Sequence, residues 1–182
     1  MKKNYIADND FFKMRRIFLL LILLVYVHTA FPQAENADDG LVWYSDVNKA
    51  HDKSKLTNLP IFAFFTGSDW CGWCHKLQRE VFSKPAFKKW ASENVVLLEL
   101  DFPRRKELPV ELVQQNLSLQ QFFEVRGYPT IWIFSISKDL EKKTFMISPL
   151  GKLGYPSAPE PGKEEIKFLE EANTILSRSG SR

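Results

Sequence analysis

The chain has 182 residues, 45% of them hydrophobic and 26% charged, a composition that excludes fibrous and wholly disordered proteins. Its formal charge is +3, but the first 34 residues contain five of the 25 basic residues and only two of the 22 acidic ones. The rest of the chain is therefore balanced in charge, so the pI of 8.8 does not indicate a nucleic-acid-binding protein, and no nucleic-acid partner is expected.

The N-terminus has the pattern of a secretory signal peptide. Residues 17–27 form an apolar run, preceded by the basic residues Lys13, Arg15 and Arg16. The run is shorter than the ~20 residues of a membrane-spanning helix and matches the apolar part of a signal peptide, about 7–15 residues. We therefore expect residues 1–34 to be the cleaved signal peptide of a periplasmic or otherwise exported protein, with an uncleaved membrane anchor as the less favoured alternative.

The boundaries of the mature chain follow from this segment. Cleavage after Ala34 would leave one domain at residues 35–182, which is long enough to bury a core. The expected start of translation is Met14, because Asp8 and Asp10 are unusual in the basic part of a signal peptide.

Short apolar runs alternate with amphipathic segments through the rest of the chain. Residues 60–66 and 95–100 are almost wholly apolar, which is typical of strands buried on both faces. Between them, Leu77 and Val81 lie four residues apart among charged neighbours, as on the buried side of an amphipathic helix. The complete predicted order is helix 46–57 (capped by Ser45), strand 60–66, a helix after Cys74, helix 83–92, strand 95–100, helix 109–124, strand 130–134, strand 143–147 and helix 164–176.

This order predicts an α/β fold with a mixed central sheet of about four to five strands and helices on both faces. A turn is expected at residues 137–139, and the basic run 104–106 is interpreted as a solvated loop. Residues 151–161 are interpreted as a loop or short edge strand, with Tyr155 as a loop anchor. The inward-facing residues expected on the last two helices are Leu112, Val113, Leu119, Phe122 and Phe123, and then Ile166, Leu169, Ala172 and Leu176.

The two cysteines, Cys71 and Cys74, lie in the sequence W-C-G-W-C-H, and three kinds of chemistry use such a pattern. A C-x-x-C pair forms a redox couple or half of a zinc site, and with the following His75 it can attach a c-type haem. A structural zinc site needs four ligands, and no second C-x-x-C or H-x-x-x-H is present. A haem needs a second iron ligand, for which Met146 and His51 are the candidates after the signal peptide. We expect neither metal nor haem, and no cofactor.

The redox interpretation fits the position of the motif. Cys71 stands between a buried strand and an amphipathic helix, and a helix N-terminus lowers the pKa of a thiol there. Cys74 lies one turn further on, within reach of a disulfide with Cys71. His75, Lys76 and Arg79 add positive charge nearby.

A second motif, G-Y-P-T, stands directly before the third predicted strand. Pro129 in this motif is a candidate for a cis peptide bond, because it follows a helix at the entrance of a strand. The preceding Tyr128 can offer its backbone groups to an extended peptide. The G-Y-P-T motif favours a cis peptide bond at Pro129 when it is combined with the strand, the C-x-x-C pair and the helix earlier in the chain.

Together the two motifs resemble thioredoxin-fold proteins, and specifically the exported bacterial thioredoxin-like group. The matching segments are T-G-S-D-W-C-G-W-C at residues 66–74 and V-R-G-Y-P-T at residues 125–130, within a resemblance that covers residues 42–176. The chain is also similar to the C-terminal domain of the membrane reductant conductor that delivers electrons to periplasmic thiols. The resemblance implies the following site residues: Cys71 as nucleophile, Cys74 as resolving thiol, Pro129 as the cis-proline, and Trp70, Gly72, Trp73, His75 and Tyr128 as substrate-binding or tuning residues.

The chain departs from the family at two places. Many thioredoxins carry a buried aspartate six or seven residues before the first cysteine, where this chain has Phe65 and Phe64. Glu99 could replace it, but we interpret Glu99 as an ordinary, partly exposed strand residue. The dipeptide between the cysteines, Gly72-Trp73, matches neither the reducing nor the oxidising members, so it does not set the direction of electron flow. Trp73 is expected to be exposed and to contact partners.

The function expected from these features is that of an exported thiol–disulfide oxidoreductase that reduces protein or peptide disulfides through Cys71 and Cys74. A disulfide oxidant or isomerase would use the same residues, and a binding or chaperone module without turnover is the alternative from another class. A reductase in an oxidising compartment needs a source of electrons. The expected partner is therefore a membrane electron-donor protein.

Overall fold

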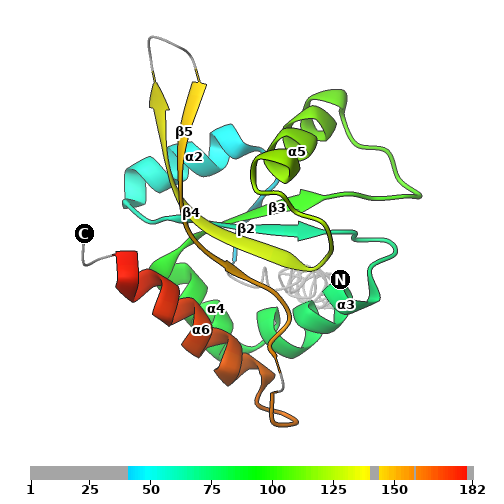
Figure 1. The fold of residues 1–182 in the computed structure, drawn as a ribbon, viewed down its shortest axis with the longest axis vertical. Helices are drawn as coiled ribbons and strands as arrows, with labels where there is room; N and C mark the ends of the chain where they lie inside the picture. Colours follow the sequence, from blue (N-terminus) through cyan, green and yellow to red (C-terminus); the bar gives the residue numbers. More distant parts are fainter. Residues whose placement is uncertain (1–40, 140–143, 158, 180–182) are drawn as a thin grey trace, which may run out of the picture. The chain divides into compact units, whose positions relative to one another are not determined.

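The computed structural model describes residues 41–139, 144–157 and 159–179 (Figure 1). The predicted signal peptide at residues 1–34, the start at Met14 and the domain boundary at residue 35 lie outside the described residues. Within the described part, no helix combines the length and the apolar character needed to pass through a bilayer.

The described strands form one mixed sheet, as the sequence predicts. Its order is β1-β3-β2-β4-β5; β1, β3 and β2 run parallel, while β4 is antiparallel to β2 and β5 is antiparallel to β4. The strands are β1 (Trp43–Tyr44), β2 (Ile61–Thr66), β3 (Val96–Asp101), β4 (Thr130–Asp139) and β5 (Thr144–Leu153).

The strand β1 and the length of the β4–β5 hairpin differ from the prediction. Two residues are too few to show an alternating pattern, so β1 had no signal in the sequence. The turn predicted at residues 137–139 is wrong, because these residues continue β4, and β5 extends to Leu153. The hairpin has a register shift between Ile133 and Phe134, where Phe134 is paired with Pro149.

Helices cover both faces of the sheet (Figure 1). They are α2 (Val47–Thr57), α3 (Gly72–Leu77), the π-helical turn η1 (Gln78–Phe82), α4 (Pro85–Asn94), α5 (Val110–Phe122) and α6 (Glu164–Ser179). The cap of α2 is Asp46 and not Ser45, because the Asp46 carboxylate accepts a hydrogen bond of 2.8 Å from the Asn48 N–H.

Alternate residues of β2 supply two separate cores. Phe62 and Phe64 belong to the cysteine-side core, which also contains Cys71, Cys74 and the inward side chains of α4 and α6. Ile61, Ala63 and Phe65 belong to the opposite core, beneath α2 and α5. Every residue of β2 is buried, which accounts for its uninterrupted apolar sequence.

Aromatic rings fill the cysteine-side core. The Phe62 ring lies about at its centre, and the centroids of five other rings lie within 6.2 Å of its own. These rings belong to Trp43, Phe82, Phe87, Trp90 and Phe168. The cluster joins β1, β2, η1, α4 and α6, and it supports the helix that carries the cysteines.

The helix faces predicted for α5 and α6 are partly wrong. Val113 and Phe122 of α5 are 40% and 53% exposed, and Ile166 of α6 is 54% exposed. The buried residues of α6 are Phe168, Ala172 and Ile175. The helix is therefore turned about its axis relative to the prediction, with Ile175 on its buried side. This orientation depends on Gly151, because a Cβ there would lie 2.6 Å from the Ile175 side chain and glycine leaves room for that side chain.

We expect Phe62→Ala to lower the free energy of unfolding by about 3–5 kcal/mol, because it opens a cavity in the middle of the aromatic cluster. Denaturant unfolding would measure this. Leu56→Ala is the control: Leu56 is 85% exposed, so its loss should change stability by no more than about 0.5 kcal/mol. Equal effects of the two substitutions would contradict the described core.

Candidate active site

A tight turn at Gly67 connects β2 to the cysteine motif. The Gly67 carbonyl accepts hydrogen bonds from the N–H groups of Trp70 (3.1 Å) and Cys71 (2.8 Å). The turn brings the Trp70 ring back over Gly67, where an added Cβ would lie 2.4 Å from the ring. Only glycine leaves this space open.

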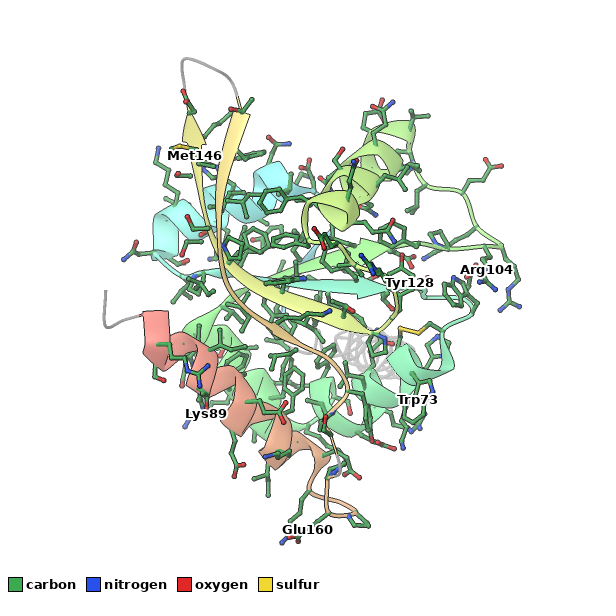
Figure 2. The ribbon with its side chains drawn as sticks, in the orientation of Figure 1. Trp73, Lys89, Arg104, Tyr128, Met146 and Glu160 are labelled. Carbon is green, nitrogen blue, oxygen red and sulfur yellow. A yellow bond between two sulfur atoms is a disulfide. The ribbon has the colours of Figure 1, made fainter. Side chains whose placement is uncertain are left out.

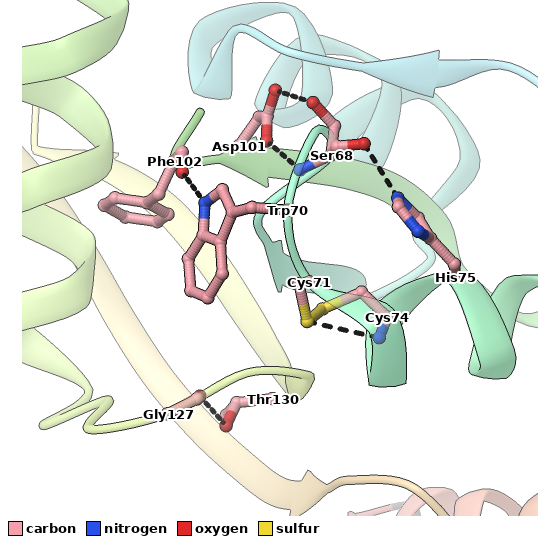
Figure 3. Close-up of a disulfide and its surroundings, with 9 residues drawn as sticks. All are labelled: Ser68, Trp70, Cys71, Cys74, His75, Asp101, Phe102, Gly127 and Thr130. Atoms are coloured by element: carbon pink, nitrogen blue, oxygen red, sulfur yellow. Dashed lines mark hydrogen bonds between the residues drawn. A yellow bond between two sulfur atoms is a disulfide. The ribbon is translucent and has the colours of Figure 1, made fainter. Parts of the chain in front are cut away.

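Cys71 and Cys74 form a disulfide at the start of α3 (Figure 3). Cys71 is the N-cap residue, and its Sγ accepts a hydrogen bond of 3.2 Å from the Cys74 N–H. Cys71 is 5% exposed and Cys74 is fully buried, so Cys71 is the cysteine that keeps some contact with solvent. An N–H directed at this sulfur would also stabilise a thiolate there.

The loop before β4 lies beside the disulfide (Figure 3). The peptide bond between Tyr128 and Pro129 is cis, and the Thr130 hydroxyl donates a hydrogen bond of 2.8 Å to the Gly127 carbonyl. Tyr128 packs against the cysteine-side core, and its ring centroid is 5.7 Å from that of Trp70. Burial raises the pKa of the Tyr128 hydroxyl to about 12, so it is neutral at ordinary pH.

Trp70 is held through its ring and through its nitrogen. Its Nε1–H donates a hydrogen bond of 2.8 Å to the Phe102 carbonyl, and the Arg104 guanidinium lies 3.9 Å from its ring centroid. The Asp69 carboxylate holds the loop that carries this guanidinium, since it accepts hydrogen bonds from the N–H groups of Arg104 (3.0 Å) and Arg105 (2.7 Å). These backbone hydrogen bonds, first that of Arg104, lower the pKa of Asp69.

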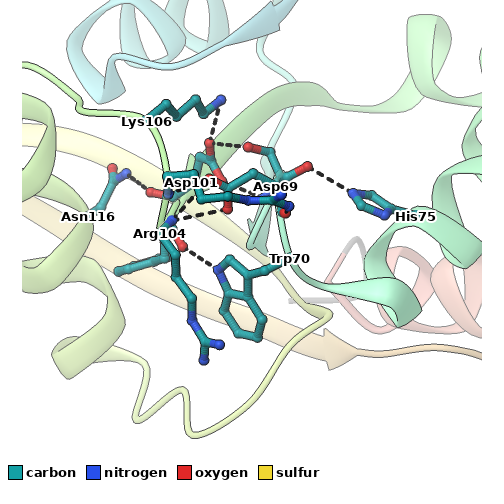
Figure 4. A network of polar contacts seen from close by, with 10 residues as sticks. Asp69, Trp70, His75, Asp101, Arg104, Lys106 and Asn116 are labelled. Atoms are coloured by element: carbon teal, nitrogen blue, oxygen red, sulfur yellow. Dashed lines mark hydrogen bonds and ion pairs between the residues drawn. The ribbon is translucent and has the colours of Figure 1, made fainter.

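His75 belongs to a polar network beside the motif (Figure 4). Its Nε2 lies 2.8 Å from the Ser68 carbonyl oxygen, and the Ser68 N–H and hydroxyl donate to the Asp101 carboxylate at 2.8 and 2.7 Å. Lys106 forms an ion pair of 2.8 Å with Asp101. Burial raises the pKa of Asp101, but the hydrogen bonds from Lys106 and Ser68 outweigh burial, and the net shift is downward. The network connects α3 to the ends of β2 and β3.

The basic run 104–106 is therefore more than the solvated loop that we expected. All three side chains are exposed, yet Arg104 stacks on Trp70 and Lys106 pairs with Asp101. The Arg105 guanidinium donates a hydrogen bond to the Asp69 carbonyl. Nothing in the spacing of the basic run indicated these contacts: Arg104 and Arg105 contact residues more than 30 positions earlier, and Lys106 pairs with Asp101 at the end of β3.

Trp73 is 58% exposed, as expected, and Tyr155 packs against it. The two ring centroids are 5.2 Å apart, and the Lys76 ammonium lies 5.0 Å from the Trp73 centroid and 4.8 Å from that of Tyr155. The Tyr155 hydroxyl donates a hydrogen bond of 2.5 Å to Glu80, and burial together with this carboxylate raises its pKa to about 12. Tyr155 thus belongs to the site, although no local pattern predicted this.

No carboxylate of β2 lies behind the cysteines, because β2 contains no acidic residue. Of the two positions where many thioredoxins carry the aspartate, Phe64 is buried in the cysteine-side core and Phe65 in the opposite core. Glu99 of β3 is partly exposed, as we expected, and lines a pocket with Gln78 and Phe82. Burial and the nearby Asp101 carboxylate raise its pKa. In the described part of the chain, no group of three or more His, Cys, Asp or Glu side chains is placed to hold a metal ion.

Similarity to solved structures places the chain in the thioredoxin-fold class. A DsbH oxidoreductase aligns with a TM-score of 0.58 at 24% identity, over 81% of this chain and 94% of that one. A thioredoxin from Thermus thermophilus aligns with a TM-score of 0.53 at 15% identity, over 78% of this chain and 92% of that one. At these identities the likeness concerns the fold alone.

The sequence comparison is more specific. Residues 47–139, more than half of the chain, match the family model of the thioredoxin-like domain, and the chain belongs to this family. It is 31% identical to the thioredoxin-related protein DsbJ of Chlamydia pneumoniae over 92% of its own length and 46% of that protein. It is 36% identical to the disulfide bond reductase DsbH of the same organism over 60% of its own length and 65% of that protein. The chain thus spans about half to two thirds of these relatives.

We expect Gly67→Ala to displace Trp70 and break its hydrogen bond to Phe102, at a cost of about 1–3 kcal/mol in stability. Tryptophan fluorescence and thermal unfolding would measure both effects. Gly127→Ala is the control, because a Cβ at Gly127 meets no atom within 4 Å. An unchanged emission spectrum and melting temperature for Gly67→Ala would contradict the close packing.

We expect Glu99→Gln to raise the melting temperature near pH 7 and to have little effect below about pH 4. The folded protein holds the Glu99 proton more tightly than the unfolded chain, whose pKa is near 4.5, so stability falls as pH rises from that value through the raised one. Glutamine removes this loss. Melting curves across this pH range would check it, and a constant difference at all pH values would oppose the pKa shift.

Proposed function

We propose that this chain is an exported thiol–disulfide oxidoreductase that reduces disulfides of proteins or peptides and uses no cofactor. The observation that carries the proposal is the Cys71–Cys74 disulfide at the start of α3, beside the Gly127–Pro129 loop. The similarity to a protein named disulfide bond reductase supports reduction as the direction.

The reaction starts from the reduced protein, in which both cysteines are thiols. The Cys71 thiolate attacks one sulfur of the substrate disulfide; a bond forms between them, the substrate S–S bond breaks, and the released thiolate takes up a proton. Cys74 then loses its proton and attacks the Cys71 sulfur. The mixed disulfide breaks, the second substrate thiol leaves, and the Cys71–Cys74 disulfide remains. Two electrons have passed to the substrate.

The surroundings of the disulfide suit these steps. The Cys74 N–H that now donates to Cys71 Sγ can stabilise the attacking thiolate. Full burial keeps Cys74 away from solvent, so that it meets Cys71 before any external disulfide. We assign the backbone of Gly127 and Tyr128 to the binding of an extended substrate segment, and Trp70, Gly72, Trp73, His75 and Pro129 to the shape and tuning of the site.

The oxidised protein must be reduced again before another turnover. We propose that residues 1–34 direct export of a domain at residues 35–182, and that a membrane protein with a dithiol donates the two electrons.

Cys71→Ser should abolish disulfide reduction, since serine is not a nucleophile toward disulfides. Cys74→Ser should instead accumulate a mixed disulfide with the substrate, visible by non-reducing electrophoresis and mass spectrometry.

Ser83→Ala is the control for both variants, because Ser83 is exposed and lies directly after η1. Reduction by Cys71→Ser, or a Cys74→Ser variant without trapped substrate, would refute the assigned roles.

The reduction potential of the Cys71–Cys74 pair tests the direction of electron flow. A value near −270 mV, about that of thioredoxin, supports a reductase, whereas about −120 to −180 mV would indicate an oxidant or isomerase.

A further inference from the structure

We infer that the surface around the disulfide selects partners whose disulfide lies in an acidic segment. The inference rests on the proposed reductase function and specifies its substrate class. Four exposed or partly exposed basic residues carry it, and we call them the cationic rim: Lys76, Arg79, Arg104 and Arg105.

One side of the rim is held at Trp70. The Arg104 guanidinium lies 3.9 Å from the ring centroid of Trp70, the residue directly before Cys71. The Asp69 carboxylate fixes the backbone beneath it through the N–H groups of Arg104 and Arg105. A cation over an aromatic face keeps its charge and loses part of its hydration, so it remains available to an incoming anion.

The other side is held at Trp73, directly before Cys74. The Lys76 ammonium lies over the rings of both Trp73 and Tyr155, with centroid distances of 5.0 and 4.8 Å. Figure 2 shows Arg104 and Trp73 on either side of the disulfide. Each tryptophan of the W-C-G-W-C motif therefore has a cation beside its ring, and each of these tryptophans is next to one of the two cysteines in the sequence.

The nearby carboxylates do not neutralise the rim. Asp69 is directed at backbone N–H groups, and Glu80 accepts the Tyr155 hydroxyl while it lies 3.9 Å from Lys76 and 3.7 Å from Arg79. Glu164 also lies near enough to Tyr155 to act on its hydroxyl, so three carboxylates stand near the four cations. The Arg104 guanidinium forms no ion pair with any carboxylate in the described part of the chain.

An acidic side chain on either side of a substrate cysteine would therefore meet a preorganised cation. Opposite charges around a binding site speed the encounter and favour the matching partner, and salt weakens both effects. Because the chain outside the signal peptide is balanced in charge overall, such a preference would come from this surface and not from net charge.

The test compares two disulfide-bonded peptides of identical sequence, one with glutamates beside the cysteines and one with glutamines at those positions. The reduced full chain should reduce the glutamate peptide roughly five-fold faster at low ionic strength, and the ratio should approach one at about 0.5 M salt. Arg104→Gln and Lys76→Gln should each lower the ratio. Lys89→Gln is the control, because Lys89 lies on α4, away from Trp73 and Arg104 in Figure 2.

Arg104→Lys separates charge from stacking, since lysine keeps the charge and should keep the preference. Equal rates for the two peptides would overturn the inference, and so would a ratio that Arg104→Gln leaves unchanged. In either case, reduction of the glutamine peptide would leave the proposed function standing. Loss of the ratio in both Arg104 variants would also overturn it, because stacking would then be the cause. If neither peptide is reduced, the proposed function and the inference fail together.

Discussion

The burial of β2 on both faces is the constraint on which the site depends. An ionised side chain is costly at a fully buried position, and β2 of this chain contains none, so its reactive groups stand where the chain leaves the sheet. Because β3 runs parallel to β2, with Asp101 paired opposite Thr66, both strands end at the same edge. The hydrogen bonds from Ser68 to Asp101 and from Trp70 to Phe102 join the two exits and position the cysteine motif.

The disulfide is thus surrounded by segments that are distant in sequence. The β3–α5 loop supplies Phe102 and Arg104, the loop before β4 supplies Tyr128, and the segment after β5 supplies Tyr155. Each segment contacts a tryptophan beside a cysteine. The two cysteines belong to an apolar core, while the surface around them is aromatic and positively charged.

The order of most elements, and the position of the cysteine pair at the start of a helix, could be predicted from the sequence because both depend on local patterns. Full burial left an unbroken apolar run in β2, and the helix start is marked by the motif itself. Three features could be found only in the folded structure and not from the sequence. The two residues of β1 are too few for a periodic signal, the buried side of α6 depends on the space left by Gly151, and the contacts of Arg104 and Tyr155 join remote segments. Apolar residues on two sides of α5 likewise made its inward face ambiguous.

The irregular pairing of the β4–β5 hairpin has a consequence for how molecules associate. As the last strand in the sheet order, β5 presents an outer edge, and the free N–H and C=O groups of such an edge can pair with a strand of another molecule. Pro149 has no N–H to offer, and the register shift beside Phe134 bends the ladder at the same level. This edge is interrupted near its middle, which opposes growth of the sheet from one molecule into the next and so protects the protein from aggregation at high concentration.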